Sequence, residues 1–391
     1  MKIDDISNLS KIAIIVIGYN RLECTGKLLN SLNEAFYPVE EVPLVISIDK
    51  SGNKALYDYV KDFYWKYGEK YVFIREERLG LQRHIFECGN LSIHFKAVIL
   101  LEDDVIVAPD YYNYFISAVN RYGEYNQVAC ISAYSNYLNG YVGLPFFPMV
   151  NHDVFAIQEV SSTGECFTSR MWNEFINWKT VHTPFDFTPL DMPEKIKRWK
   201  EAWTKYYNAY MVLEDKYCVY PCFSTITNTG AAGVHSVHSE TVVQTVLMTG
   251  RRKWDMPKFD DLVKYDIYTN NICLYKTLGY KQNELCLDMY GHNPNYLGKR
   301  YVLTTKRLPY KIIKGFELSY RPHELNIEYN NPGDDVRLYD TSIKTVKNGG
   351  RFNNELINYY LYGFNVKSLP YFSICKILEI LKQKCKKKLQ S

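Results

Sequence analysis

Three consecutive carboxylates, Glu102, Asp103 and Asp104 (the acidic triplet), directly follow an apolar run at residues 97–101. Neighbouring negative charges repel one another, and a bound divalent cation relieves that repulsion. Oxygen ligands at the end of a rigid strand suit Mn²⁺ or Mg²⁺, which also contact substrate phosphates. Because side chains alternate along an extended chain, we expect Glu102 and Asp104 on one side and Asp103 on the other. The alternative reading is a solvated acidic turn.

The mainly apolar runs at residues 12–17, 43–48 and 97–101 predict strands that are buried on both faces of a parallel sheet. The segments between these runs carry apolar residues at helical spacing, which predicts helices there. Thr25 is the expected N-cap of the first helix. The order strand, helix, strand, helix, strand predicts a doubly wound α/β fold with a mostly parallel sheet.

Polar side chains follow each of these three runs. Tyr19, Asn20 and Arg21 come after the first run, Asp49 after the second, and the acidic triplet after the third. Ligands of α/β sheets bind outside the carboxyl ends of the strands. We therefore expect these groups to surround one cleft.

The second half of the chain has a looser pattern. Apolar spacing predicts helices over residues 163–179 and 195–210, and a strand over 217–223. That strand leads into a glycine-containing loop at residues 228–236, which is the second conspicuous polar site. After Arg251, turn signals alternate with short amphipathic pieces, so we expect a helical and irregular extension and assign it no topology.

Composition narrows the function classes. Of 391 residues 47% are hydrophobic and 23% charged, as in ordinary globular chains, and no run approaches the eighteen or so apolar residues of a membrane span.

The ten cysteines lack zinc or redox spacing, and no export signal is recognised, so a cytoplasmic location is expected. Residues 376–388 hold six lysines and one glutamate, which leaves −1 for the remainder of a chain of net charge +4. This near-neutral body argues against nucleic-acid binding.

Several nucleotide-binding and hydrolytic motifs are missing from the sequence. It has no G-x-x-x-x-G-K-[ST] loop, no G-x-G-x-x-G after the first run, and no G-x-S-x-G elbow. Without a glycine cradle, a bound diphosphate would be neutralised by a metal ion and by side chains such as Arg21.

Residues 12–21, 46–49, 98–115 and 130–133, taken in order, resemble the GT-A glycosyltransferases. More narrowly, they are similar to the β-1,2-N-acetylglucosaminyltransferase I group and to bacterial family-2-like sugar transferases. The likeness spans about residues 11–236, and its most specific motif is E-D-D-x-x-V-A-P-D. It implies a GT-A fold with a Rossmann-like nucleotide-binding half, and an inverting, metal-dependent transfer of sugar from a UDP-sugar.

The resemblance also implies a role for each matching residue. Asp104 falls on the last acid of the family's metal-binding triplet, which is expected to hold Mn²⁺ (or Mg²⁺) on the donor diphosphate. Glu102 and Asp103 match positions that contact the donor's sugar and ribose. Asp49 matches the acid that binds uracil, and Arg21 matches a donor-binding arginine.

The catalytic base is where the chain departs from the family pattern. An inverting transferase needs a carboxylate to deprotonate the acceptor hydroxyl. Similar bacterial sequences carry an aspartate where this chain has Thr204. Glu201, three residues earlier and on nearly the same face of the expected helix, is the preferred candidate, and Glu165 is the other. Glu201 could equally be a solvated helix position.

His235 lies in a loop that resembles the segment closing over the donor in the bacterial enzymes. We expect it to contact the donor, with capping of a buried loop as the alternative.

The C-terminal residues 371–389 combine an apolar helical stripe with many lysines. That pattern predicts a helix lying on an anionic membrane surface, and the alternative is a solvated terminal helix. The expected division of the chain is a GT-A domain at 1–240 (nucleotide-sugar half 1–135, acceptor half 136–240), a C-terminal extension at 241–370 and a basic amphipathic tail at 371–391.

The sequence therefore predicts a glycosyltransferase acting on a glycan or lipid-linked glycan, in bacterial surface polysaccharide biosynthesis, at the inner face of the membrane. A sugar nucleotidyltransferase and a catalytically inactive glycan-binding relative are the alternatives. The absent glycine-rich signature weighs against the first, and the missing acid at Thr204 leaves room for the second.

Overall fold

A nine-stranded sheet forms the centre of the protein, with strand order β13-β9-β11-β6-β10-β4-β1-β2-β3. The computed structural model describes residues 8–135, 137–200, 202–232, 242–345, 354–361 and 365–390. In the first half of the sheet, four parallel strands lie in the order β4-β1-β2-β3. Their bounds are Asn8–Gly18 (β1), Leu44–Ile48 (β2), Lys70–Ile74 (β3) and Phe95–Glu102 (β4).

The second half of the sheet is mixed. β10 runs antiparallel to both of its neighbours, β4 and β6, and β9 runs antiparallel to β11. Five of the eight pairings in the sheet are parallel, which confirms the predicted mostly parallel α/β sheet. The bounds are Val128–Ser132 (β6), Val154–Ile157 (β9), Glu165–Thr168 (β10), Tyr217–Pro221 (β11) and Lys264–Tyr265 (β13).

Helices cover both faces of the sheet, because successive side chains of its strands enter two different cores. On β1, Ala13 and Ile15 belong to one core, whereas Ile14 and Val16 belong to the other. The first core takes side chains from α3, α5 and α7, and the second from α1, α2 and α4. The bounds are Leu22–Glu34 (α1), Lys54–Asp62 (α2), Leu81–Gly89 (α3), Tyr111–Tyr122 (α4), Ser169–Val181 (α5) and Trp203–Leu213 (α7).

Three local predictions were wrong. Thr25 is not an N-cap, because α1 already begins after Arg21, and the Thr25 hydroxyl donates to the Arg21 carbonyl from inside the helix. The expected helix at 163–179 starts as strand β10, because pairing with β4 and β6 outweighs the helical spacing. The expected helix at 195–210 is two helices, α6 (Glu194–Lys197) and α7.

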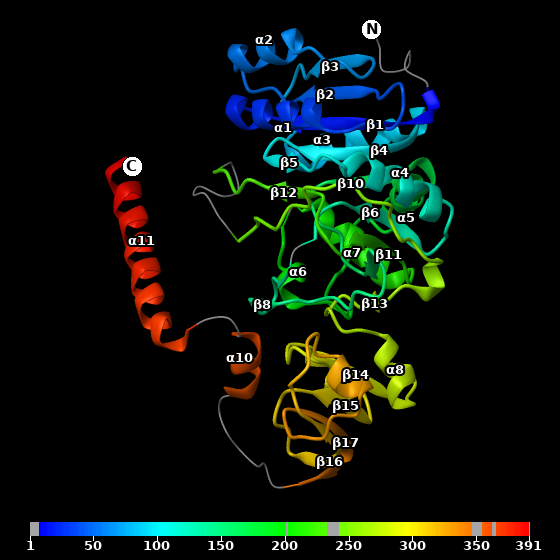
Figure 1. Ribbon diagram of the computed structural model, residues 1–391, viewed down its shortest axis with the longest axis vertical. Coiled ribbons are helices and arrows are strands. Elements are labelled where there is room, and N and C mark those ends of the chain that lie inside the picture. Colours follow the sequence, from blue (N-terminus) through cyan, green and yellow to red (C-terminus); the bar gives the residue numbers. More distant parts are fainter. Residues whose placement is uncertain are drawn as a thin grey trace.

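The region after Arg251 contains a second sheet, where we had expected helical and irregular structure. Its four strands have the order β14-β15-β17-β16. Figure 1 shows this sheet on the far side of the central sheet from β2 and β3. The bounds are Leu285–Asp288 (β14), Tyr301–Thr304 (β15), Tyr310–Phe316 (β16) and Val336–Lys344 (β17), with α8 (Cys273–Leu278), α9 (Leu325–Glu328), α10 (Asn354–Tyr360) and α11 (Leu369–Gln390) around and beyond it.

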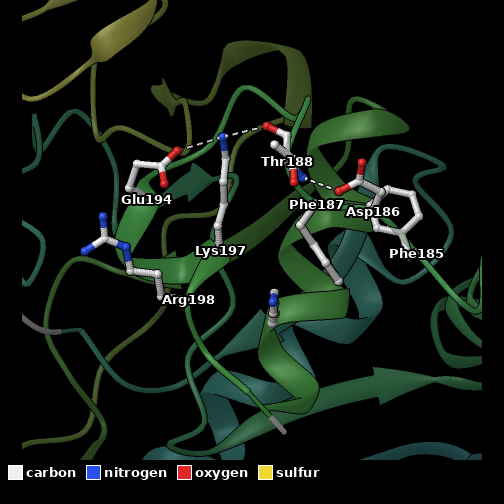
Figure 2. A pocket seen from close by; sticks show the side chains of 8 residues that line it. Phe185, Asp186, Phe187, Thr188, Glu194, Lys197 and Arg198 are labelled. Atoms are coloured by element: carbon white, nitrogen blue, oxygen red, sulfur yellow. Dashed lines mark hydrogen bonds and ion pairs between the residues drawn. The ribbon is translucent and has the colours of Figure 1, made fainter.

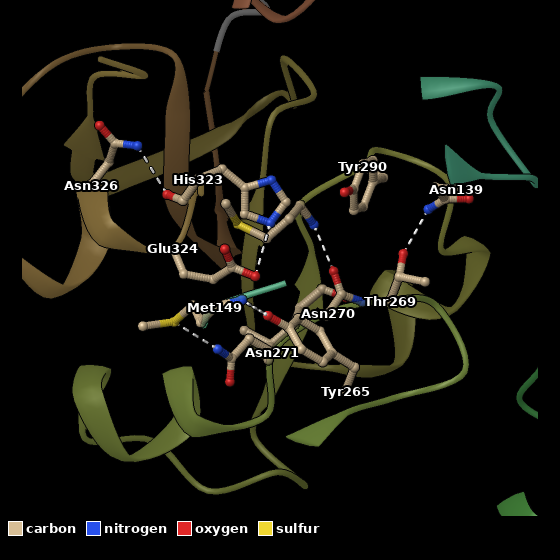
Figure 3. Close-up of polar contacts among 12 residues, drawn as sticks. Asn139, Met149, Tyr265, Thr269, Asn270, Asn271, Tyr290, His323, Glu324 and Asn326 are labelled. Atoms are coloured by element: carbon tan, nitrogen blue, oxygen red, sulfur yellow. Dashed lines mark hydrogen bonds and ion pairs between the residues drawn. The ribbon is translucent and has the colours of Figure 1, made fainter. Parts of the chain in front are cut away.

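A shared core and a buried polar network join the two sheets. Leu287 and Leu338 of the second sheet belong to the same core as Phe155 of the central sheet. Figure 3 shows polar contacts around this junction, including those of Asn270, which follows β13. The Asn270 side-chain amide donates to the carbonyl of Leu287 in β14 at 3.0 Å. The chain also returns to the central sheet after residue 240 to add β13, so the predicted division at 240 is not where the central sheet ends.

Within the described residues, no helix has the length and apolar character needed to cross a membrane.

Candidate active site

The register of β1 and β4 brings their two carboxyl ends together. Ile17 pairs with Glu102, so the loop after β1 and the turn after β4 leave the sheet at the same edge. Gly18 allows the close approach there, because a Cβ at this position would come within 2.8 Å of the Ile48 side chain and 3.8 Å of the Asp103 Cβ. Arg21, at the start of α1, lies directly beyond this edge.

Arg21 binds two acids of the triplet. Its Nη2 atom contacts Asp103 Oδ1 and lies 3.1 Å from Asp104 Oδ2. The predicted alternation of side chains fails here, because β4 ends at Glu102 and the chain turns, so that Asp103 and Asp104 both reach the same guanidinium.

The triplet holds more negative charge than one arginine neutralises. Burial raises the pKa of Glu102 to about 8, and the charges of Asp104 and Asp103 add to the shift. Burial also raises the pKa of Asp103, against the opposing hydrogen bond from Arg21. Asp103 Oδ2 is buried without a hydrogen-bond partner among the described residues. A positively charged ligand would relieve both the repulsion among these buried carboxylates and the missing hydrogen bond of Asp103 Oδ2.

Glu165 lies beside this cluster, on the strand that pairs with β4. It is opposite Leu100 in the register, and its side chain is 2% exposed. Burial, followed by the charge of Glu102, raises the pKa of Glu165 well above its ordinary value. Gly164 turns the chain into this strand at φ +73°, and a Cβ there would meet the Ile226 side chain at 2.6 Å. The structure thus places a buried, proton-holding carboxyl next to Glu102.

Asp49, at the end of β2, is held by backbone donors. Its Oδ1 atom accepts hydrogen bonds from the N–H groups of Lys50 and Leu79, both at 2.8 Å, and its Oδ2 atom accepts one from Gly80 at 3.0 Å. Asp49 therefore fixes the loop that leads into α3, and its Oδ2 atom keeps capacity for one further donor.

The glycine-containing loop also reaches the triplet. β12 (Ile226–Asn228) pairs with β5 (Val105–Val107), the short strand after the acids. The Thr229 N–H donates to the Asp104 carbonyl at 2.7 Å, and Arg21 Nη1 donates to the Ala231 carbonyl at 3.5 Å. Two polar sites predicted from distant parts of the sequence are therefore one site.

Two predicted site residues, Glu201 and His235, lie outside the described residues.

A hollow of about 290 Å³ lies between α6, the start of α7 and the segment before α6 (Figure 2). It combines aromatic rings with charged side chains, and Lys205 Nζ stands 4.1 Å from the ring centroid of Phe187. None of the predicted donor-site residues that the structure describes lines this hollow. Its lining is Phe185, Asp186, Phe187, Thr188, Glu194, Lys197, Arg198 and Lys205.

Sequence reasoning missed two arginines near the ends of β1 and β2. The Arg78 guanidinium lies 4.8 Å from the ring centroid of Tyr19. Arg75 Nε donates to Ser47 Oγ at 3.2 Å, and Ser47 Oγ also lies 2.6 Å from His84 Nε2. The signal that could have found them is the cluster of charged residues between 75 and 83.

The donor set fits a divalent cation that is open to a substrate. Carboxylate oxygens are the ligands that Mn²⁺ and Mg²⁺ prefer, and the buried Asp103 Oδ2 lacks a partner within the described part of the chain. In that same part, no cluster of three or more His, Cys, Asp or Glu side chains forms a ready cage. A cation at Asp104 would therefore need oxygens from water or a diphosphate to complete its shell.

Comparison with known proteins gives structural likeness only. No family model and no curated protein matches the sequence. The S. aureus TarS fragment 1–349 in complex with UDP-GlcNAc is similar over 58% of this chain and 60% of its own length, with a TM-score of 0.39 and 16% identity. GalNAc-T7 with UDP, GalNAc and Mn²⁺ is similar over 56% of this chain and 43% of its own length, with a TM-score of 0.40 and 10% identity. The mannosyltransferase PcManGT from Pyrobaculum calidifontis, in complex with GDP-Man and Mn²⁺, is similar over 44% of this chain and 47% of its own length. Its TM-score is 0.31 and its sequence identity 12%.

The chain thus spans less than two thirds of the length of each of these structures. At these scores the likeness carries no argument about activity, so the functional case is made from the chain's own residues.

Proposed function

We propose that this protein is an inverting, metal-dependent glycosyltransferase that moves a sugar from a UDP-sugar to a glycan or lipid-linked glycan. The observation that carries the proposal is the cluster of Arg21, Asp103 and Asp104 at the joined carboxyl ends of β1 and β4. Ligands of α/β sheets bind at that edge. An acidic triplet with one arginine suits a diphosphate bridged by a cation.

Each residue of the cluster has a distinct task in this proposal. Asp104 would hold Mn²⁺ or Mg²⁺, which supplies charge stabilisation to the departing diphosphate. Arg21 binds the diphosphate oxygens from the other side, since its planar fork suits phosphate groups. Glu102 and Asp103 contact the sugar and ribose of the donor, and Asp49 accepts the uracil N–H at its remaining lone pair.

The carboxylate that deprotonates the acceptor hydroxyl is proposed to be Glu201, with Glu165 as the second candidate. Glu165 is buried and holds its proton in the donor-free state, which disfavours it as a base. His235 is proposed to contact the donor from the loop that follows Ala231.

The proposed setting is the assembly of bacterial surface polysaccharide, on the cytoplasmic side of the membrane. A membrane-bound acceptor would account for a lysine-rich terminal segment on an otherwise near-neutral chain.

A donor-hydrolysis assay tests the activity. With Mn²⁺ and a panel of UDP-sugars, the protein is expected to release UDP slowly from at least one donor, and Asp104→Ala is expected to abolish the release. Absence of release from every donor would favour a glycan-binding protein. Pyrophosphate release from a nucleoside triphosphate and a sugar phosphate would favour a nucleotidyltransferase.

A further inference from the structure

The helix α11 exposes apolar side chains that no other part of the described chain covers. Tyr371, Phe372, Ile374, Ile377, Leu378 and Leu381 are each between 51% and 67% exposed. Figure 1 shows α11 standing clear of both sheets. Contiguous exposed apolar surface of this kind marks an interaction site in a soluble protein.

The apolar residues form a stripe on the first turns of the helix, and five of its six lysines follow toward the C-terminal end. Tyr371, Ile374, Leu378 and Leu381 recur every three or four residues and so form one stripe. The six lysines of the helix all lie between residues 376 and 388, where they stand against one glutamate. A helix with an apolar stripe and many lysines lies in the plane of a membrane interface, where lysines are attracted to anionic lipids.

The position of α11 relates this surface to the candidate active site. In Figure 1 the helix stands on the side of the molecule toward which β5 and β12 lie. The segment around Thr245 lies beside β12, because the Thr245 N–H donates to Thr227 Oγ1 at 3.0 Å. Two valines of this segment, Val242 and Val246, are 54% and 76% exposed.

We propose that α11 docks on the surface of an anionic lipid bilayer, with its apolar stripe among the headgroups, and so turns the donor-site edge toward a lipid-linked acceptor. Charge complementarity selects the anionic bilayer as the occupant. The orientation toward an acceptor rests on the proposed function, whereas docking itself does not.

Vesicle co-sedimentation of the full chain tests the docking. Ile374→Ser/Ile377→Ser removes part of the apolar surface, and Lys376→Gln/Lys382→Gln removes two charges. Ile312→Ser/Ile313→Ser and Lys311→Gln/Lys314→Gln on β16 are matched controls, because Ile312 and Ile313 are 45% and 44% exposed and both lysines are exposed. The vesicles contain either phosphatidylcholine alone or phosphatidylcholine with 30 to 40% phosphatidylglycerol, where the percentage is roughly that of an anionic inner leaflet.

Binding to the anionic vesicles only, weakened by salt, is expected. The lysine pair should lower the affinity by about 30-fold and the isoleucine pair by at least about tenfold, while the β16 controls bind as the unchanged protein does. Equal binding to both vesicle types, equal loss in the controls, or no binding would overturn the proposal. So would an α11-dependent dimer in solution that leaves vesicles unbound, since the stripe would then cover a second copy of the chain.

The same proteins separate docking from catalysis. The α11 variants should release UDP from a soluble UDP-sugar at an unchanged rate, and Asp104→Asn should bind anionic vesicles normally. Vesicle binding without UDP release from any donor would reject the proposed function and leave docking intact.

Discussion

Arg21 Nη2 lies 3.1 Å from Asp104 Oδ2, and the same nitrogen contacts Asp103. One guanidinium is thus shared by two acids of the triplet and leaves part of their negative charge uncompensated. Asp103 is 4% exposed and Arg21 side-chain exposure is 26%, so much of this interaction is shielded from water. The arrangement links the start of α1 to the end of β4 and makes the loop after β1 dependent on the acids.

Arg21→Ala is expected to damage both stability and activity. It leaves the Asp103 carboxylate buried without its partner, which should lower the free energy of unfolding by about 3 kcal/mol. It also removes a diphosphate contact, which should lower the rate of UDP release by about 100-fold. Thermal denaturation and the hydrolysis assay measure the two effects. Arg21→Lys should recover most of the stability and little of the rate, because a lysine keeps the charge and loses the fork. Full activity in Arg21→Ala would contradict the role.

Asp49→Asn separates loop support from uracil recognition. An amide in place of the carboxylate loses at least one of the three backbone hydrogen bonds, which should cost about 1–3 kcal/mol of unfolding free energy. If Asp49 also binds uracil, the affinity for UDP should fall by more than that for GDP, both measured by calorimetry with Mn²⁺. An unchanged ratio of the two affinities would show that Asp49 supports the loop and does not bind uracil.

The two candidate bases should respond differently to neutral replacement. Because burial keeps a proton on Glu165, Glu165→Gln should leave the melting temperature within a degree or two, a range of about 1 kcal/mol in unfolding free energy for a chain of this size. Transfer to an acceptor should fall by at least about 100-fold in Glu201→Gln and far less in Glu165→Gln. The reverse order of the two transfer rates would assign the base to Glu165.

His84 should make the protein less stable in mild acid. Burial, with the nearby Arg75 charge, lowers the pKa of His84 to about 4, so the ring stays neutral in the folded protein while the unfolded chain takes up a proton below about pH 6.5. The unfolded state then binds more protons, and the free energy of unfolding falls as the pH drops from 6.5 toward 4.

His84→Gln keeps a hydrogen-bonding group near Ser47 and removes this titration. Denaturant unfolding at pH 7 and pH 4.5 should show a drop smaller by about 2 kcal/mol than in the unchanged protein. His94→Gln, at a partly exposed position, controls for the loss of a histidine. An identical drop in the His84 variant would refute the explanation.

The parts of the fold that were predictable from sequence are those where local pattern and tertiary position agree. The buried runs that became β1, β2 and β4 carry no polar alternation, and the polar groups after them meet because parallel strands end at one edge. The strand β10 was missed because its helical spacing gives way to pairing with β4 and β6, which no local pattern reveals. The second sheet was missed because two of its strands, β14 and β15, have only four residues each, and the connections from β14 to β15 and from β16 to β17 are long.

The candidate site divides in the same way. Asp104 and Arg21 could be paired from topology, since both follow neighbouring strand ends. The three backbone donors to Asp49 could not be foreseen, because two of them come from Leu79 and Gly80 in a loop without a recognisable motif. The break between α6 and α7 was also hidden, because the apolar spacing runs through it.

Binding of UDP with and without Mn²⁺ tests the central claim most directly. Calorimetry on the unchanged protein, on Asp104→Asn and on the exposed α2 variant Asp58→Asn compares the metal dependence of one ligand in three matched samples. The account predicts that Mn²⁺ tightens UDP binding at least about tenfold in the unchanged protein and in Asp58→Asn, and that Asp104→Asn loses this gain. Equal UDP affinity with Mn²⁺ and with a chelator, or a metal gain that survives in Asp104→Asn, would contradict it.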